Sequence, residues 1–139
     1  MKLYKRGFTP GVFDMFHIGH LNIFKRAKEN CEFLVVGVNS DEMTYERKQK
    51  YPVIGFEDRL TIVESIRYVD LAVKLTNKDH YYNVLHYNCD VIFVGDDWKG
   101  TEKWNLLEKQ FEPHHINVVY FSYTDHISST ILRDKESVE

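Results

Sequence analysis

Two histidines stand three residues apart in a short segment near the start of the sequence. The segment reads GVFDMFHIGH from Gly11 to His20 and leads into a predicted helix. At this spacing on an opening helical turn, His17 and His20 can face the same side. Gly19 lets a ligand approach the backbone, and the free N–H groups of a helix start favour an anion. The segment therefore predicts a phosphate-binding site.

Two other interpretations of the histidine pair stay open on these residues alone. The histidines could be ordinary core or surface side chains. A zinc site is the weaker alternative, because Asp14 is the only other candidate ligand in the segment and a closed site needs a fourth. We therefore predict no metal bound by protein ligands.

The hydrophobic pattern predicts the scaffold that would hold these residues. The run from Phe33 to Val38 is uninterrupted and apolar, as in strands buried on both faces of a parallel sheet. The predicted strands are 8–13, 33–38, 71–73, 91–94 and 116–121, and the predicted helices are 19–30, 56–69, 81–87, 101–111 and 128–138. This alternation predicts an α/β fold, a doubly wound (Rossmann-like) parallel five-stranded sheet with helices on both faces. Its ligands should lie beyond the carboxyl ends of the strands, where the strand order reverses.

The composition limits the kinds of partner. The chain has 139 residues, 18 basic and 21 acidic side chains, a net charge of -3 and 43% hydrophobic residues. A mildly acidic total argues against broad nucleic-acid binding, and no apolar run approaches the roughly 18 residues of a membrane span. Cys31 and Cys89 predict buried thiols rather than a disulfide framework. We expect one cytoplasmic domain over residues 1–139, without nucleic-acid or membrane partners.

The chain resembles the cytidylyltransferase family of nucleotidyltransferases. The resemblance rests first on Thr9-Pro10-Gly11-Val12-Phe13-Asp14 followed by His17 and His20. It continues through 35–42, through 59–70 with its IRYVD run, and through the GDDW turn from Gly95 to Trp98, so it covers nearly the whole chain. In length and in the GDDW turn, the chain is most similar to the members that act on glycerol 3-phosphate.

The resemblance implies a reaction and its partners. An alcohol phosphate, by preference glycerol 3-phosphate, would attack the α-phosphorus of CTP in line, giving CDP-glycerol and pyrophosphate. Mg²⁺ would bind to the triphosphate, and the protein would be a homodimer. A phosphomonoester is already largely ionised near pH 7, so the site needs no general base. It has to hold two anions in line and to neutralise charge on them.

The resemblance also implies roles for individual residues. His17 and His20 would contact the triphosphate. Lys48 and Lys50, in the basic run after the second strand, would reach the phosphates, and Arg47 is the alternative candidate. On composition alone, this run would be a solvated loop. The further nucleotide-binding candidates are Thr9, Gly11, Phe13, Asp14, Gly19, Thr124, Ile127, Ser128 and Ser129. The candidates for the acceptor are Arg67, Asp97, Trp98 and Tyr123.

The match departs from the family in the last loop. Family members carry an arginine where this chain has Tyr123 and a glycine where it has His126. Losing a permanent cation from a phosphate site costs roughly 1.5 to 3 kcal/mol, unless His126 or Arg133 replaces it. The departure puts the acceptor in doubt more than the nucleotide.

Several alternatives therefore stay open. The acceptor could be phosphoethanolamine, phosphocholine or another polyol phosphate of wall or capsule polymers, or a heptose phosphate used with ATP. The chain could also be a nucleotide-binding sensor without activity, which would bind CTP but release no pyrophosphate. A dinucleotide-binding oxidoreductase is disfavoured, because no GxGxxG follows the first predicted strand.

Overall fold

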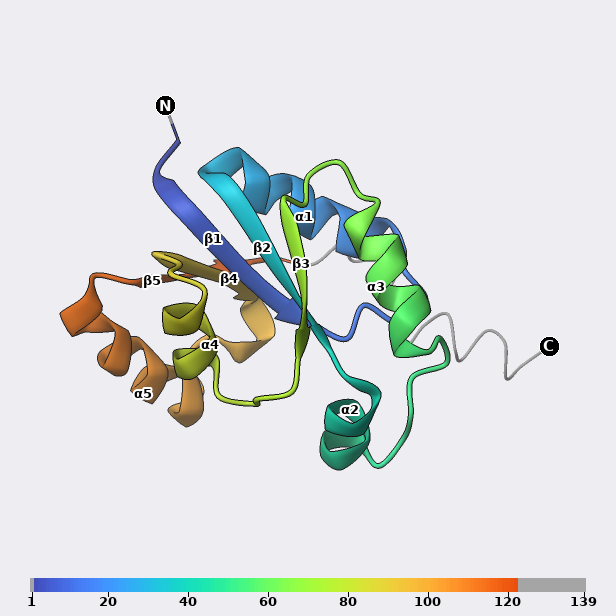
Figure 1. The fold of residues 1–139 in the computed structure, drawn as a ribbon. Helices are drawn as coiled ribbons and strands as arrows, with labels where there is room; N and C mark the ends of the chain where they lie inside the picture. Colours follow the sequence, from blue (N-terminus) through green and yellow to red (C-terminus); the bar gives the residue numbers. More distant parts are fainter. Residues whose placement is uncertain (1, 123–139) are drawn as a thin grey trace.

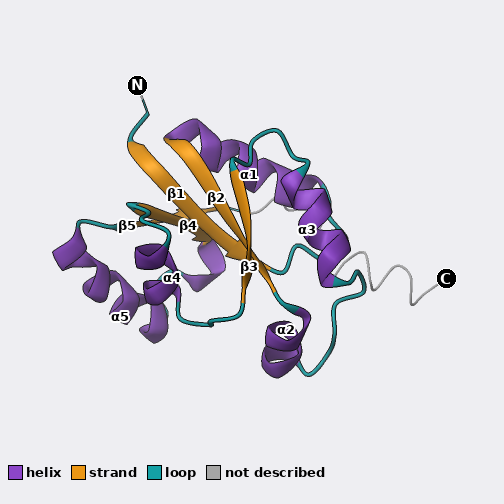
Figure 2. Ribbon diagram, viewed as in Figure 1, coloured by secondary structure: helices purple, strands orange, loops and turns teal. Residues whose placement is uncertain are grey.

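A computed structural model describes residues 2–122 of the chain (Figure 1). Strands and helices alternate from the first strand onward (Figure 2). The strands are β1 (Tyr4–Gly11), β2 (Cys31–Asn39), β3 (Leu71–Leu75), β4 (Val91–Gly95) and β5 (Asn117–Phe121). The helices are α1 (Ile18–Asn30), α2 (Asp41–Lys48), α3 (Phe56–Glu64), α4 (His80–His86) and α5 (Glu102–Phe111), with 3-10 turns η1 (Asp96–Trp98) and η2 (Glu112–His114).

All neighbouring strands pair in parallel, in the order β3-β2-β1-β4-β5. The order reverses between β1 and β4, because the chain passes from β1 outward to β2 and β3 and then returns to the other side of β1. This confirms the predicted five-stranded doubly wound sheet. It also defines the point at which ligands of such sheets bind, beyond the carboxyl ends of β1 and β4.

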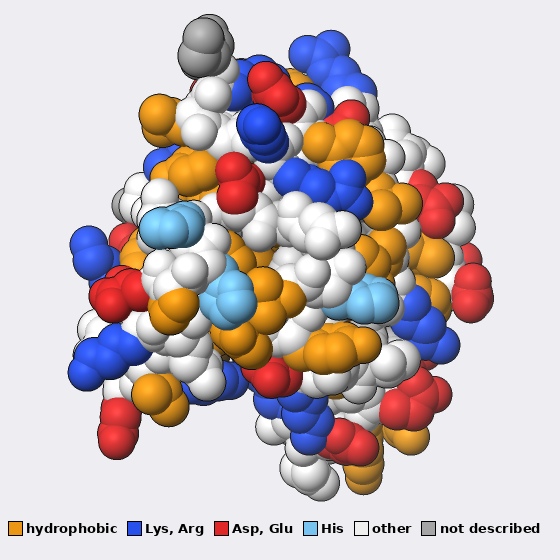
Figure 3. All heavy atoms as spheres, turned by 60° about the vertical axis from the view of Figure 1, so that its left-hand side comes forward, with side chains coloured by type: hydrophobic (Ala, Val, Ile, Leu, Met, Phe, Trp, Pro, Cys, Tyr) orange, Lys and Arg blue, Asp and Glu red, His pale blue; other side chains and the backbone are white. Residues whose placement is uncertain are grey.

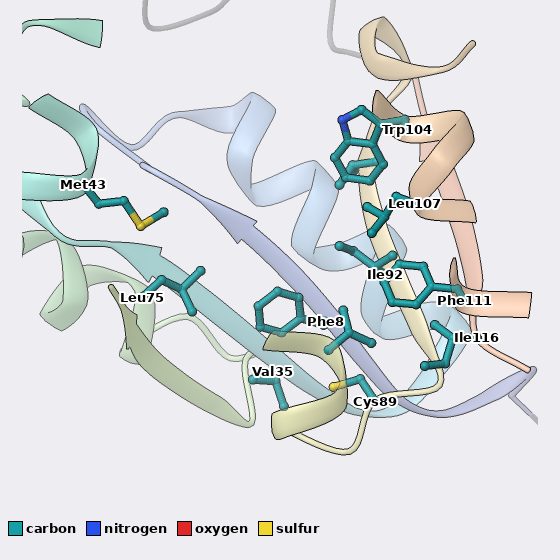
Figure 4. Close-up of a cluster of buried hydrophobic side chains, with 12 residues drawn as sticks. Phe8, Val35, Met43, Leu75, Cys89, Ile92, Trp104, Leu107, Phe111 and Ile116 are labelled. Atoms are coloured by element: carbon teal, nitrogen blue, oxygen red, sulfur yellow. The ribbon is translucent and has the colours of Figure 1, made fainter. Parts of the chain in front are cut away.

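Two apolar layers cover the two faces of the sheet. One layer packs α1 and α3 on the sheet through residues such as Phe24 and Val63. The other packs α4 and α5 on the opposite face and includes Trp104 and Phe111 (Figure 4). Met43 of α2 joins the second layer, so this short helix is anchored to the side of α4 and α5.

The structure differs from the predicted elements by more than two residues in three places. The first strand, predicted at 8–13, spans Tyr4–Gly11, because its pairing with β2 begins at Tyr4 and ends at Gly11. The helix predicted at 56–69 ends at Glu64, because the N–H of Ser65 is shared between the carbonyls of Thr61 and Ile62 and the chain continues in turns. Helix α2 was predicted as a loop. The helix predicted at 128–138 lies outside the described residues.

The charged side chains form no broad basic surface on the face shown in Figure 3, where described acidic and basic side chains are interspersed. Among residues 2–122, no helix has the length and apolar character needed to cross a membrane.

Candidate active site

The segment after β1 turns sharply before α1 begins. Phe13 and Met15 have φ angles of 54° and 48°, in the left-handed region that non-glycine residues seldom adopt. The Phe13 ring is buried against Phe24, with 5.0 Å between ring centroids, and meets the edge of His20 at 5.6 Å. A Cβ on Gly11 would lie 2.8 Å from the Phe13 ring. These contacts hold the turn, called the His turn below (residues 11–20), in one conformation.

The two histidines cap helix α1 reciprocally. The Nδ1 of His17 accepts a hydrogen bond from the Gly19 N–H at 3.0 Å, and the Nδ1 of His20 accepts one from the His17 N–H at 3.3 Å. The rings stack with 3.9 Å between centroids. Because Nδ1 is an acceptor in both rings, the proton of each neutral imidazole is on Nε2. The pair therefore offers two N–H donors side by side.

Both histidines are neutral at physiological pH. Burial lowers the pKa of His17 from its ordinary value of 6.5. The pKa of His20 is lowered to about 3, mainly by burial and then by the neighbouring His17, against a smaller opposing effect of Asp14. Neutral Nε2–H donors can bind phosphate oxygens, whereas in this tautomer neither Nε2 can ligate a metal ion.

The opposite side of the reversal point is formed by η1, which follows β4 directly. Asp96 and Asp97 are exposed there, and Trp98 is half-buried. The guanidinium of Arg47, on α2, lies 5.5 Å from the Trp98 ring centroid. Trp98 itself packs towards Trp104 at 6.5 Å. Helix α2 and the η1 turn are thus brought together beyond the carboxyl ends of the strands.

Helix α2 presents the predicted basic run. Its N-cap is Ser40, whose hydroxyl accepts from the Met43 N–H at 3.1 Å. Lys48 ends the helix, and exposed Lys50 lies in the loop that follows. Basic residues in the last turn also suit the helix dipole. The structure therefore places both lysines on the carboxyl side of the sheet, as exposed cations.

Two nucleotide-binding candidates make internal hydrogen bonds. The hydroxyl of Thr9 donates to the Phe93 carbonyl at 2.9 Å, which joins β1 to β4. The Asp14 carboxylate is buried and accepts from the N–H groups of Val53 and Ile54, each at 2.8 Å. Asp14 thereby connects the His turn to the loop after α2.

The positions of two arginines, Arg67 and Arg59, were not predicted from the sequence. Arg67 lies in the turns before β3, at the amino end of the strands, with its guanidinium 5.1 Å from the Tyr68 ring. The structure does not bring it near the histidines of the same chain. Arg59, to which sequence analysis gave no role, is fully buried beneath the His turn and donates to the Val12 carbonyl at 2.7 Å. Its only sequence signal is a cation on the otherwise apolar side of a predicted helix.

A hollow of about 300 Å³ borders the His turn along α1. It begins at Gly19 and extends past Lys25 and Arg26 to Ser122 at the end of β5. The five remaining candidates lie outside the described residues; they are Tyr123, Thr124, Ile127, Ser128 and Ser129. Within residues 2–122, no group of three or more metal-binding side chains could hold an ion.

Known proteins match this chain over nearly its full length. Residues 8–135 match the model of the Cytidylyltransferase-like family. The glycerol-3-phosphate cytidylyltransferase of Bacillus subtilis (strain 168) is 36% identical over 132 residues, covering 94% of this chain and 96% of that protein. The enzyme of the same name from Staphylococcus aureus (strain NCTC 8325 / PS 47) is 32% identical, covering 94% of each. The crystal structure of the lipopolysaccharide core biosynthesis protein from Thermoplasma volcanium GSS1 superposes with a TM-score of 0.75 at 28% identity, covering 88% of this chain and 99% of that one.

Proposed function

This chain belongs to the cytidylyltransferase-like family of nucleotidyltransferases, and on that premise we propose that it joins CTP to glycerol 3-phosphate, releasing pyrophosphate and CDP-glycerol. The observation that carries the proposal is the reciprocal cap of α1, which leaves two neutral Nε2–H donors at the reversal point of the sheet. The alignments with relatives named for the same reaction cover nearly the whole of this chain and of each relative.

The histidines act as hydrogen-bond donors in this reaction. When the acceptor phosphate oxygen attacks the α-phosphorus, negative charge grows on the oxygens of the triphosphate that is breaking. The Nε2–H groups of His17 and His20 bind those oxygens. Their rings are already fixed by the backbone bonds to Nδ1, so no reorganisation is needed as the charge develops.

Different elements of the protein bind the two anions, CTP and the acceptor phosphate. The His turn holds the nucleotide beyond β1, and the N–H groups at the start of α1 add a partial positive charge. The acceptor phosphate enters from the side of α2 and η1, where Lys48, Lys50 and Arg47 supply cations. Asp97 and Trp98 then hold the hydroxyl-bearing end of the acceptor. This arrangement reduces the repulsion between two phosphates brought within bonding distance.

Magnesium binds through the phosphates of CTP in this proposal. The donor tautomer of the histidine pair fits phosphate oxygens and not the cation. Bound there, Mg²⁺ would neutralise charge on the departing pyrophosphate. The chain's own residues then hold the anionic complex rather than the free ion.

We also propose that the protein is a homodimer. Strand β3 is an edge of the sheet and carries exposed Leu71, and α3, which packs against β3, carries exposed Ile62. An edge strand presents unpaired N–H and C=O groups with which another chain can pair. Light scattering behind size exclusion would measure twice the 16.6 kDa chain mass if the proposal holds, and a mass of one chain would contradict it.

The test of the function is a substrate screen scored by pyrophosphate. Purified protein is incubated with CTP or ATP and with glycerol 3-phosphate, phosphoethanolamine, phosphocholine or a heptose phosphate. We expect turnover with CTP and glycerol 3-phosphate, none with ATP, and loss of turnover when EDTA removes the magnesium. Binding of CTP without turnover of any acceptor would instead support a nucleotide sensor, and turnover with another acceptor would reassign the substrate.

A further inference from the structure

We propose that Arg59 is a positioning residue, which fixes the loop between α2 and α3 (residues 49–55) against the His turn and so presents Lys50 to the substrate phosphates. The inference rests on the proposed function for the role of Lys50. It concerns a side chain that touches no substrate and that sequence analysis left without a role.

Arg59 donates hydrogen bonds to several stretches of the chain that are distant in sequence. Its Nε donates to the Ile54 carbonyl in the 49–55 loop at 2.9 Å. One terminal nitrogen donates to the Val12 carbonyl of the His turn at 2.7 Å and to the Asn39 carbonyl at the end of β2 at 2.9 Å. The other donates to the Asp41 carboxylate at the start of α2 at 2.7 Å. A single guanidinium thus links three stretches of the chain: the 49–55 loop, the His turn and the junction between β2 and α2.

A second contact reinforces the same connection. Asp14, in the His turn, accepts from two consecutive N–H groups of the 49–55 loop, those of Val53 and Ile54. The backbone of Ile54 is therefore held at its N–H by Asp14 and at its carbonyl by Arg59. Lys50 is four residues before this clamped position and two after the end of α2. The loop cannot move away from the His turn without breaking these bonds.

Burial makes the arginine hard to replace. The Arg59 side chain is fully excluded from solvent, whereas its partner Asp41 keeps 32% of its side chain exposed. Arginine can serve several acceptors at once because its guanidinium carries five N–H donors in a fixed plane. A lysine would keep the charge, but its single ammonium nitrogen could not reach acceptors spread around the edge of the guanidinium. The shape of the group, as well as its charge, is what holds the segments.

The chain contains a matched control at the amino end of the strands, away from the site. Asp90, just before β4, also accepts from two backbone N–H groups, those of Lys5 at 3.1 Å and Arg6 at 3.0 Å. Asp41 likewise has two donors, Arg59 and the Phe56 N–H at 3.3 Å. Substituting either aspartate by asparagine replaces a carboxylate that accepts two hydrogen bonds by a neutral amide. Only Asp41 is linked to the site.

The experiment compares Arg59→Lys and the milder Asp41→Asn with Asp90→Asn. Amide hydrogen exchange without substrate is measured over 49–55, together with CTP affinity and steady-state constants for glycerol 3-phosphate. We expect exchange in 49–55 to rise at least tenfold in Arg59→Lys and measurably in Asp41→Asn, with kcat/KM for glycerol 3-phosphate reduced by tenfold or more. Asp90→Asn should lower the melting temperature while leaving loop exchange and kcat/KM within twofold of the parent protein.

A double-mutant cycle with Lys50→Ala separates positioning from general stability. If Arg59 acts through the loop, Lys50→Ala should reduce kcat/KM at least tenfold in the parent protein but less than threefold in the Arg59→Lys background. Additive effects, or a Lys50→Ala variant with parental kinetics, would overturn the inference. So would unchanged loop exchange in both Arg59→Lys and Asp41→Asn, even if Arg59→Lys proved unstable. If the parent protein turned over no acceptor, the proposed function would fail, and loop exchange with CTP affinity would still decide whether Arg59 orders the loop.

Discussion

The chemistry of single residues in this site depends on which ring nitrogen of each histidine faces the backbone. His17 and His20 each use Nδ1 as a helix-cap acceptor, so the proton that reaches a ligand is on Nε2. Burial of the rings lowers the pKa of both side chains and keeps them neutral. One arrangement therefore serves two purposes, because it starts α1 and orients two donors. Alanine substitutions would confuse these roles, since they remove both.

Substituting His17 by asparagine should separate capping from catalysis. Asparagine is a good N-cap, and its side-chain oxygen can take the place of Nδ1, but it carries nothing at the position of Nε2. We expect His17→Asn to keep the melting temperature within a few degrees of the parent protein while kcat falls by about 100-fold or more, an effect typical of losing one preorganised donor. Thermal melts and pyrophosphate assays measure the two effects separately.

The comparison variant for that prediction is His17→Ala, which loses the cap as well. It should lower the free energy of unfolding by about 1 kcal/mol and reduce kcat by a similar factor. An asparagine variant with normal kcat would remove the Nε2–H of His17 from the mechanism.

At the scale of elements, α2 shows what sequence analysis could not predict. Its signals are present, since Ser40 is a good cap and Asp41 and Glu42 occupy the first turn. The helix has little apolar periodicity, however, because only Met43 and Thr44 are buried. Hydrophobic patterning therefore predicted a loop. The long α1 and α5 were predicted within one residue at each end because each buries a regular apolar stripe.

The basic end of α2 should decide how well the anions bind. We expect Lys48→Met and Lys50→Met each to raise KM for glycerol 3-phosphate, or the Kd of CTP, by about tenfold to 100-fold, since a charge-assisted hydrogen bond contributes roughly 1.5 to 3 kcal/mol. Methionine keeps the apolar length of lysine and removes the charge. Lys78→Met is the control, because Lys78 contacts the same helix by an exposed ion pair with Glu46 at 2.8 Å. Equal changes in all three variants would indicate a general effect of net charge.

At the scale of the whole molecule, the site is a consequence of strand order. Alternating apolar segments and the His17–His20 spacing were sufficient to predict the doubly wound sheet and the turn that borders its reversal point. The contacts between distant segments were not predictable. The bonds of Arg59 to Val12 and Asn39 span 47 and 20 residues of sequence, and no local pattern encodes them. Tertiary connections of this kind determine how the loops meet.

Binding at the reversal point should change tryptophan fluorescence. The chain has two tryptophans, and they differ in exposure: Trp98 is half-buried on η1, while Trp104 is buried in the core. Addition of CDP-glycerol, the proposed product that carries the acceptor end, should quench or shift the emission of the parent protein and of Trp104→Phe. The change should be lost in Trp98→Phe. A response that persists in Trp98→Phe and disappears in Trp104→Phe would place the acceptor end of the ligand elsewhere or indicate a change in the core.

The stability of the whole molecule should depend on pH through two largely buried histidines, His80 and His20. His80, at the start of α4, packs on Trp104 of α5 at 5.2 Å between ring centroids. Burial lowers its pKa to about 4, and the positive charges of Lys103 and Arg47 add to this effect against the opposing charge of Asp79. The pKa of His20 is lowered as well, to about 3. The unfolded chain, with histidine pKa values near 6.5, therefore binds protons that the folded chain does not.

Acidification should consequently destabilise the protein, and replacing His80 should reduce that sensitivity. The contribution of His80 is fully present above pH 6.5 and is lost as the pH falls towards 4, so between pH 7 and pH 5 it lowers the free energy of unfolding by about 1 to 2 kcal/mol. His80→Phe keeps a ring against Trp104 and cannot titrate. Urea unfolding at both pH values should therefore give a smaller loss in His80→Phe than in the parent protein. His86→Phe, on the same helix, is the control and should leave the loss unchanged. An equal loss in the parent protein and in His80→Phe would show that His80 is protonated in the folded state at pH 5, and that its burial against Trp104 does not hold it neutral.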